Sequence, residues 1–317
     1  MHLVLSLDGG GVRCVMQIVL LSRLVERLPY LLDAVTVFAG TSGGSFLALA
    51  LANDGLASAM QVFSEDNVRK IFSEPWGVAG GYGLWRPRFS PHALQSILRD
   101  MYGSAELGDL KRRVFVPTFD LNGEVCKRDA SHHNCGVQHW TPCFAHNFPD
   151  SDHLQEELVE VAMRSSAAPT YFPSRGEYVD GGVVANNPSA QLIAKLVQQG
   201  VPLEEICVLS IGTGNAPYHV EPEQSQVMGL SQWATHIVDL LMDAPAEGSV
   251  VMSKNLLGAR FHRCNPELEA PIDLSDASQF AKLVRIAYEF DLEPTVAYLE
   301  KHWFPELQGL QQVNFTI

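Results

Sequence analysis

The feature that most constrains the fold is a pair of glycine turns, each placed between an apolar strand pattern and a helical pattern. Residues 3–8, LVLSLD, lead into three glycines at 9–11. Residues 35–40, VTVFAG, lead into the turn TSGG. Apolar residues at helical spacing follow both turns. Strands that alternate with helices predict an α/β fold, here a three-layer sandwich around a mostly parallel central sheet.

The alternation continues along the chain. Further strands are predicted at 113–121, 177–182 and 205–214, and further helices at 58–73, 91–102, 153–164 and 188–199. The strand 205–214 is expected to be the last core strand, because it is apolar and ends in a glycine turn. From residue 228 onward helical patterns dominate, at 229–243, 249–258 and 278–303. Residues 122–150 are expected to be irregular. The pattern predicts a core over 1–215 and a helical C-terminal region over 216–317 packed on the same domain.

Charge excludes one class of partner. The chain carries 36 acidic and 22 basic residues, a formal net charge of -14, without a Lys/Arg run. This balance argues against a nucleic acid polymer and against electrostatic capture by anionic membranes.

Six scattered cysteines do not form a disulfide framework, and neither a signal peptide nor a membrane-length apolar run is visible. We therefore expect a cytoplasmic protein that meets a bilayer through apolar or aromatic contacts.

The second glycine turn has the pattern of a nucleophile elbow. Gly40-Thr41-Ser42-Gly43-Gly44 lies between a strand and a helix, as the G-x-S-x-G motif requires. Glycines two residues before and after Ser42 let the strand fold closely against the helix. The serine oxygen is then exposed near the positive end of that helix, where a developing oxyanion is stabilised. The alternative is a Gly/Ser-rich turn without chemistry, because the pattern is common.

The first glycine turn, Gly9-Gly10-Gly11, can expose consecutive N–H groups toward an anion. One interpretation is a phosphate cradle, but the Lys-Ser/Thr of a P-loop is absent. The other is an oxyanion hole beside Ser42. Arg13 would then support the loop or attract a phosphate headgroup.

The base that would activate Ser42 is less evident. Histidines after Ser42 are plentiful, but none lies in a short glycine-flanked turn directly after a strand. Asp180 ends a predicted strand and precedes Gly181-Gly182, so it is expected at the same sheet edge as Ser42. An Asp-Gly pair is also an ordinary turn. From these residues alone the base stays open.

Four motifs in order resemble the patatin-like phospholipase family: DGGGVR at 8–13, GTSGG at 40–44, SSAAPTYFP at 165–173 and VDGGVVANNP at 179–188. The resemblance covers about the first 215 residues and implies a patatin-like catalytic core. It implies a Ser-Asp dyad without histidine, with Ser42 as nucleophile and Asp180 as base. The loop Gly9, Gly10 and Gly11 would form the oxyanion hole, supported by Arg13, Gly40, Gly44 and Gly181.

Two loops offer further candidate contacts. The Gly/Pro-rich stretch 74–91 carries the lipid-contact candidates Trp76, Tyr82, Trp85 and Phe89, which either anchor the protein at a lipid interface or pack on the core. The 132–146 loop is rich in histidine and cysteine, but its spacing fits no four-ligand metal site. We therefore expect no metal and no cofactor.

The leading hypothesis is a phospholipase A-type lipid acyl hydrolase. Its substrate would be a phospholipid or another acyl ester, reached by transient peripheral association with a membrane surface. The alternatives are a carboxylesterase or thioesterase, and a catalytically idle regulatory module on the same fold. A small-molecule or protein activator, or oligomerisation, is a further hypothesis, since an unregulated lipase would damage the membranes of its own cell.

Overall fold

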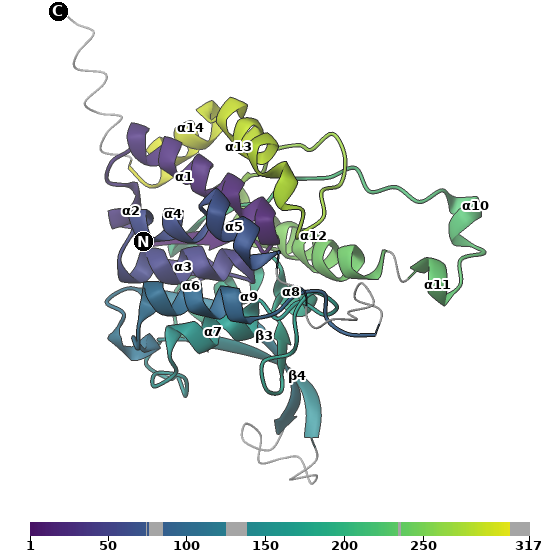
Figure 1. The fold of residues 1–317 in the computed structure, drawn as a ribbon. Coiled ribbons are helices and arrows are strands. Elements are labelled where there is room, and N and C mark those ends of the chain that lie inside the picture. The colour runs from purple at the N-terminus through teal and green to yellow at the C-terminus, as the bar shows by residue number, and fades with distance from the viewer. Residues whose placement is uncertain (74, 76–84, 125–137, 234–235, 305–317) are drawn as a thin grey trace, which may run out of the picture.

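The structure is a computed structural model that describes residues 1–73, 75, 85–124, 138–233 and 236–304 of the 317-residue chain (Figure 1). Its centre is a seven-stranded sheet in the order β4-β3-β2-β1-β6-β7, with β5 paired to β3. The strands are β1 His2–Leu7, β2 Val37–Gly40, β3 Arg113–Glu124, β4 Gln138–His146, β5 Tyr178–Asp180, β6 Ile206–Ile211 and β7 Phe261–Cys264. Only β4 and β5 run antiparallel to their neighbour β3. The predicted α/β fold with a mostly parallel sheet is confirmed.

The central strands explain the three layers. Strands β1 and β6 are almost entirely buried, as expected for parallel strands covered on both faces. Along β1, Leu5 and Leu7 point into one apolar core and Val4 into the other, because successive side chains of a strand alternate between faces. Each core is closed by helices, which gives a helix-sheet-helix sandwich.

The larger core is covered by most of the helices, and Figure 1 shows α1, α3 and α6 lying across that face. These helices are α1 Val15–Arg27, α2 Leu31–Ala34, α3 Gly43–Asn53, α4 Leu56–Val62, α5 Glu65–Ile71, α6 His92–Tyr102, α7 Leu158–Ser165, α13 Phe280–Glu289 and α14 Glu293–His302. The smaller core is closed by α9 Ser189–Gln198 and the end of α12 Ile237–Leu257. The remaining helices are the short α8 Gly182–Ala185, α10 Pro222–Ser225 and α11 Leu230–Trp233. Short 3-10 turns lie at Gly11–Cys14, Leu107–Asp109, Leu203–Glu205, Gly258–Arg260 and Ala277–Gln279.

Three local predictions were wrong. Strand β4 lies inside the segment expected to be irregular; its outer half is exposed, so it lacks the apolar alternation that marks a strand. Strand β7 follows β6 and pairs with it in parallel, so 205–214 is not the last strand. Helix α12 runs unbroken through Pro245, where the sequence suggested two helices. Buried Met242 and Ala246 flank this proline, so packing outweighs its low helix propensity.

Helices α13 and α14 pack on the sandwich. The Arg23 guanidinium on α1 donates to the carbonyl oxygens of Ala287 and Phe290 at 2.7 and 2.8 Å. The Tyr298 hydroxyl on α14 donates to the carbonyl oxygen of Val208 on β6 at 3.0 Å. The division into 1–215 and 216–317 stays a prediction.

Candidate functional site

Strand β3 brings Ser42 and Asp180 together. Its beginning pairs in parallel with β2, where Ala39 lies opposite Phe115. Further along, β3 pairs antiparallel with β5, where Asp180 lies opposite Thr118. Because β2 and β5 run in opposite directions along β3, their last residues approach each other. Ser42 follows the end of β2 by two residues, and Asp180 is the last residue of β5.

Ser42 occupies a strained turn. Its φ of 52° lies in the left-handed region, which a residue other than glycine enters only where its surroundings hold it. The close approach of strand and helix explains the flanking glycines: a Cβ on Gly40 would lie 2.1 Å from the Gly44 carbonyl oxygen. The Ser42 N–H donates to the Ser165 hydroxyl at 2.9 Å, and that hydroxyl donates to the Pro117 carbonyl oxygen at 2.7 Å. These contacts hold the backbone of the Ser42 turn in place.

The Ser42 hydroxyl donates to Asp180 Oδ2 over 2.7 Å. The second carboxylate oxygen, Oδ1, accepts the N–H of Gly182 at 2.7 Å. The Asp180 side chain is fully buried, and this burial raises its pKa to about 7, although the Ser42 hydroxyl and the Gly182 N–H favour the charged form. A carboxyl group with this pKa accepts and returns a proton near neutral pH.

The SSAAPTYFP segment positions the end of β5. The N–H of Asp180 donates to the Ala167 carbonyl oxygen at 3.0 Å, and the N–H of Gly181 donates to the Ser165 carbonyl oxygen at 3.1 Å. Ser165 therefore contacts both the Ser42 turn and Gly181, the residue that follows Asp180. Sequence reasoning assigned the hydroxyl of Ser165 no role of its own, because a serine in a small-residue run carries no special signal.

The glycine loop lies against the elbow. The Gly9 N–H donates to the Asn186 carbonyl oxygen at 3.0 Å, so it is engaged within the protein. In the part of the chain that the structure describes, no hydrogen bond engages the N–H groups of Gly10 and Gly11. Gly11 lines the same cleft as Ser42. These two N–H groups are therefore the donors of this loop that remain free for a ligand.

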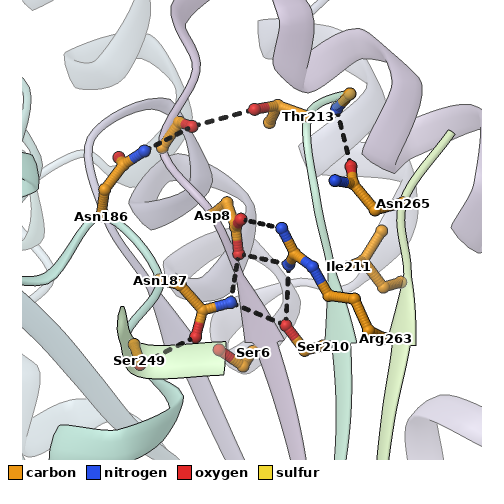
Figure 2. A network of polar contacts seen from close by, with 12 residues as sticks. Ser6, Asp8, Asn186, Asn187, Ser210, Ile211, Thr213, Ser249, Arg263 and Asn265 are labelled. Atoms are coloured by element: carbon orange, nitrogen blue, oxygen red, sulfur yellow. Dashed lines mark hydrogen bonds and ion pairs between the residues drawn. The ribbon is translucent and has the colours of Figure 1, made fainter. Parts of the chain in front are cut away.

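A buried polar network lies behind the loop (Figure 2). Arg263 on β7 grips both carboxylate oxygens of Asp8, at 2.8 Å from Nη1 to Oδ1 and 2.5 Å from Nη2 to Oδ2. The Asn187 amide donates to Asp8 Oδ1 at 2.7 Å and to the Ser210 hydroxyl at 2.8 Å. Sequence reasoning missed Arg263, since an arginine in a four-residue strand 255 positions from Asp8 offers no local signal.

Arg13 points into the protein. The residue is buried, with only 3% of its surface exposed. Burial raises the pKa values of Asp239 and Asp243 on α12, and the nearby positive charge of Arg13 lowers them in part. Arg13 thus links the glycine loop to α12 electrostatically, and it does not face solvent where a headgroup would approach.

An apolar cleft opens from Ser42, and the space between its lining atoms is about 510 Å³ when the open solvent at its mouth is included. Its lining residues come mainly from α3 to α6 and the 165–173 segment: Gly11, Ser42, Gly43, Phe46, Phe63, Val68, Ile71, Phe72, Leu94, Ser166, Ala168, Tyr171, Phe172 and Leu274. Such a lining accommodates a hydrocarbon chain and offers few hydrogen-bond partners to a polar group.

The aromatic candidates of the 74–91 stretch differ in their exposure. Trp85 is 83% exposed. Phe89 is half-buried, with its ring centroid 5.4 Å from that of Phe72 and 5.8 Å from that of Phe172, so it packs beside the cleft. Trp76 and Tyr82 lie outside the described residues. No helix among the described residues is long and apolar enough to cross a membrane.

Of the His/Cys loop 132–146, residues 138–146 are described and 132–137 lie outside the described residues. There, Cys143 Sγ is 3.8 Å from His153 Nε2, and burial lowers the pKa of His146 to about 4. Among the residues that can be described, no three His, Cys, Asp or Glu side chains gather as metal ligands would.

Comparison with known proteins adds an independent finding. Residues 5–193 match the profile described as patatin-like phospholipase. The chain is 32% identical to the protein CotR of Bacillus subtilis, over 95% of this chain and 98% of the relative. It is 28% identical to a cGAMP-activated phospholipase of Pseudomonas aeruginosa, over 81% of this chain and 76% of the relative. The crystal structure of VipD from Legionella pneumophila is similar at a TM-score of 0.47 and 14% identity, covering 95% of this chain and 67% of that one.

Proposed function

Because this chain belongs to the patatin-like phospholipase family, we propose that it is a phospholipase A-type lipid acyl hydrolase that works through Ser42 and Asp180. The observation that carries the proposal is the 2.7 Å hydrogen bond from the Ser42 hydroxyl to a fully buried Asp180, at one end of an apolar cleft. Family membership supports a lipid acyl hydrolase in general. The assignment of roles to individual residues is ours.

The proposed reaction has two steps. Asp180 takes the proton of Ser42 while the serine oxygen attacks the ester carbonyl carbon, and the N–H groups of Gly10 and Gly11 stabilise the oxyanion. Asp180 then returns the proton to the departing alcohol, which leaves an acyl group on Ser42. In the second step Asp180 takes a proton from water, the resulting hydroxide attacks the acyl group, and the serine oxygen regains a proton from Asp180. Fatty acid is released and the dyad is restored.

The direct test offers purified protein two substrates, phosphatidylcholine vesicles and a soluble p-nitrophenyl butyrate. We expect release of fatty acid from the vesicles. Hydrolysis of the soluble ester alone would favour the esterase alternative, and inactivity on both would favour an idle module. Trp85→Ala serves as a matched variant: if Trp85 contacts the bilayer, the rate on vesicles falls while the rate on the soluble ester is unchanged.

Activation by a ligand is the second candidate property. Two relatives, from Pseudomonas aeruginosa and Escherichia coli, are described as cGAMP-activated phospholipases. We therefore propose running the assay with and without added cGAMP. A rate that is unaffected by the nucleotide would remove this activator from consideration.

We further propose that the cleft binds the acyl chain. Val68 on α5 is 1% exposed and lines the cleft, so Val68→Phe fills part of its volume. The ratio of kcat/KM for a long-chain ester to that for an acetate ester is expected to fall at least about tenfold, the lower end of the range for a one-methylene misfit in an apolar pocket. Val62→Phe on α4, equally buried but outside the lining, is the matched control. An unchanged ratio in Val68→Phe would place the acyl chain elsewhere.

A further inference from the structure

The residue that begins the glycine loop is held by side chains from distant parts of the chain. Asp8 directly precedes Gly9 at the end of β1, and Arg263 reaches it from β7. Arg263 Nη1 also donates to the Ser210 hydroxyl of β6 at 2.9 Å. The two side chains are 4% and 18% exposed, so the pair is shielded from water. A bidentate arginine-carboxylate pair fixes orientation as well as distance.

The same network holds the loop backbone on both sides of Gly9. The Gly9 carbonyl oxygen accepts the Thr213 hydroxyl at 3.0 Å, and the Gly9 N–H donates to the Asn186 carbonyl oxygen at 3.0 Å. The next residue, Asn187, donates to the carboxylate oxygen of Asp8 that Arg263 Nη1 also contacts (Figure 2). With both polar groups of Gly9 engaged, the directions of the following two N–H groups depend on these anchors.

The network also connects the loop to the proposed base. Asn186 and Asn187 follow α8, and the N-cap of α8 is Gly181, the residue after Asp180. The N–H of Ser189 and the hydroxyl of Ser249 both donate to Asn187 Oδ1, at 3.1 and 3.2 Å. Asn187 is therefore held while it contacts Asp8. The glycine loop and the Asp180 turn consequently rest on one set of buried contacts, of which Arg263 is the charged member supplied by the C-terminal region.

We propose that Arg263 is a positioning residue that holds the Gly10 and Gly11 N–H groups in register with Ser42. It acts through Asp8 and does not touch the substrate. The proposal rests on the proposed hydrolase function. Arg263 lies beyond the matched residues 5–193, so the C-terminal region would contribute to transition-state stabilisation. Lysine cannot replace it, because an ammonium cannot bind both carboxylate oxygens and Ser210 in the same planar geometry.

The test compares kcat, KM and inhibition by an alkyl trifluoromethyl ketone, which forms a tetrahedral adduct that mimics the oxyanion. Rates are expressed per active site, titrated with a fluorophosphonate that labels Ser42. For Arg263→Lys we expect kcat on p-nitrophenyl butyrate to fall about 10- to 100-fold, since a loop misplaced by about 1 Å weakens the oxyanion contacts by that order. KM should stay within about twofold, and the inhibition constant should rise by the same factor as kcat falls.

Two further variants distinguish a loss of positioning from a loss of folding. Arg263→Met leaves Asp8 buried without its partner and is expected to fold poorly. The double variant Asp8→Asn/Arg263→Met removes both charges, so it should fold and still show the low kcat. The control is Arg27→Lys, because Arg27 makes a bidentate pair with Glu293 that also joins the first helix to the C-terminal region, far from the loop. This control should keep wild-type kcat.

The outcomes separate the two proposals. If wild-type protein hydrolyses the ester and Arg263→Lys has the same kcat and inhibition constant per titrated site, the positioning role is wrong and the hydrolase function stands. If wild-type protein hydrolyses no ester and is not labelled, the proposed function itself fails. The pH midpoint of the variants should match that of wild type, because burial, Ser42 and Gly182 set the pKa of Asp180 and Arg263 does not. A shifted midpoint would contradict action through the loop alone.

Discussion

Ser42→Ala is expected to abolish hydrolysis of both phosphatidylcholine and p-nitrophenyl butyrate, by about 10⁴-fold or more. The substitution removes the oxygen that forms the acyl-enzyme, and among the described residues no other hydroxyl or thiol donates a hydrogen bond to Asp180. The side chain is 7% exposed and its hydroxyl makes one strong hydrogen bond, to Asp180, so the fold should tolerate the change. Fluorophosphonate labelling should disappear together with the activity.

The matched control for this variant is Ser253→Ala. Ser253 is a fully buried serine on α12, outside the cleft that Ser42 lines. Its loss tests whether removing a buried hydroxyl by itself reduces the rate. Substantial residual activity in Ser42→Ala, with Ser253→Ala normal, would mean that another group attacks the ester.

Asp180→Asn is expected to lower kcat by about 10³- to 10⁴-fold, because an amide cannot accept the Ser42 proton. In wild-type protein kcat/KM should rise with pH and level off above about 7, since only the charged carboxylate acts as base. The small residual rate of Asp180→Asn should lack this step. Asp120→Asn, on neighbouring β3, is the control for a local Asp-to-Asn change. A midpoint that persists in Asp180→Asn would assign the titration to another residue.

The same variant is expected to be more stable than wild type in neutral and alkaline solution. Burial raises the folded pKa of Asp180 from the ordinary 3.8 to about 7, so the folded state binds the proton more tightly than the unfolded state. Wild-type stability therefore falls as pH rises from about 4 to about 7, by at most about 4 kcal/mol from this group. Asparagine removes that loss. The melting temperatures of the two proteins should be similar at pH 4 and separate at pH 8.

If Asp180→Asn loses activity and gains stability, Asp180 serves catalysis and not folding. A charge buried for catalysis opposes folding, because desolvation disfavours it. If Asp180→Asn were less stable than wild type at pH 8, the carboxylate would be structural. Stability and rate measured on one variant therefore distinguish the two roles.

The local parts of the site were predictable from the sequence. Gly40 and Gly44 mark a strand-to-helix turn by their spacing around Ser42, and the strain at Ser42 is a property of that turn. Asp180 could be placed on a strand end beside two glycines. Sequence reasoning left the choice between a histidine and Asp180 open until the four ordered motifs were considered together. In the structure the Ser42 hydroxyl contacts Asp180 directly.

The contributions of distant segments were not predictable in the same way. Phe89 was a candidate for lipid contact, yet its ring packs against Phe72 and Phe172, while Trp85 in the same loop is exposed. Periodicity distinguishes the faces of a helix or strand, but it does not apply to an irregular loop. Whether such a ring is inside or outside depends on what the rest of the chain places beside it.

By itself the sequence determined the alternating fold, the sharp turn at Ser42 and the glycine loop, because strands, turns and helices depend on residues a few positions apart. Only the tertiary structure decided that β2 and β5 meet on β3, that the Ser165 hydroxyl accepts the Ser42 N–H, and that Arg263 binds Asp8. Each of these contacts joins segments that are more than a hundred residues apart or lie on different strands. Such pairings depend on strand order and register in the folded sheet, which no local pattern contains.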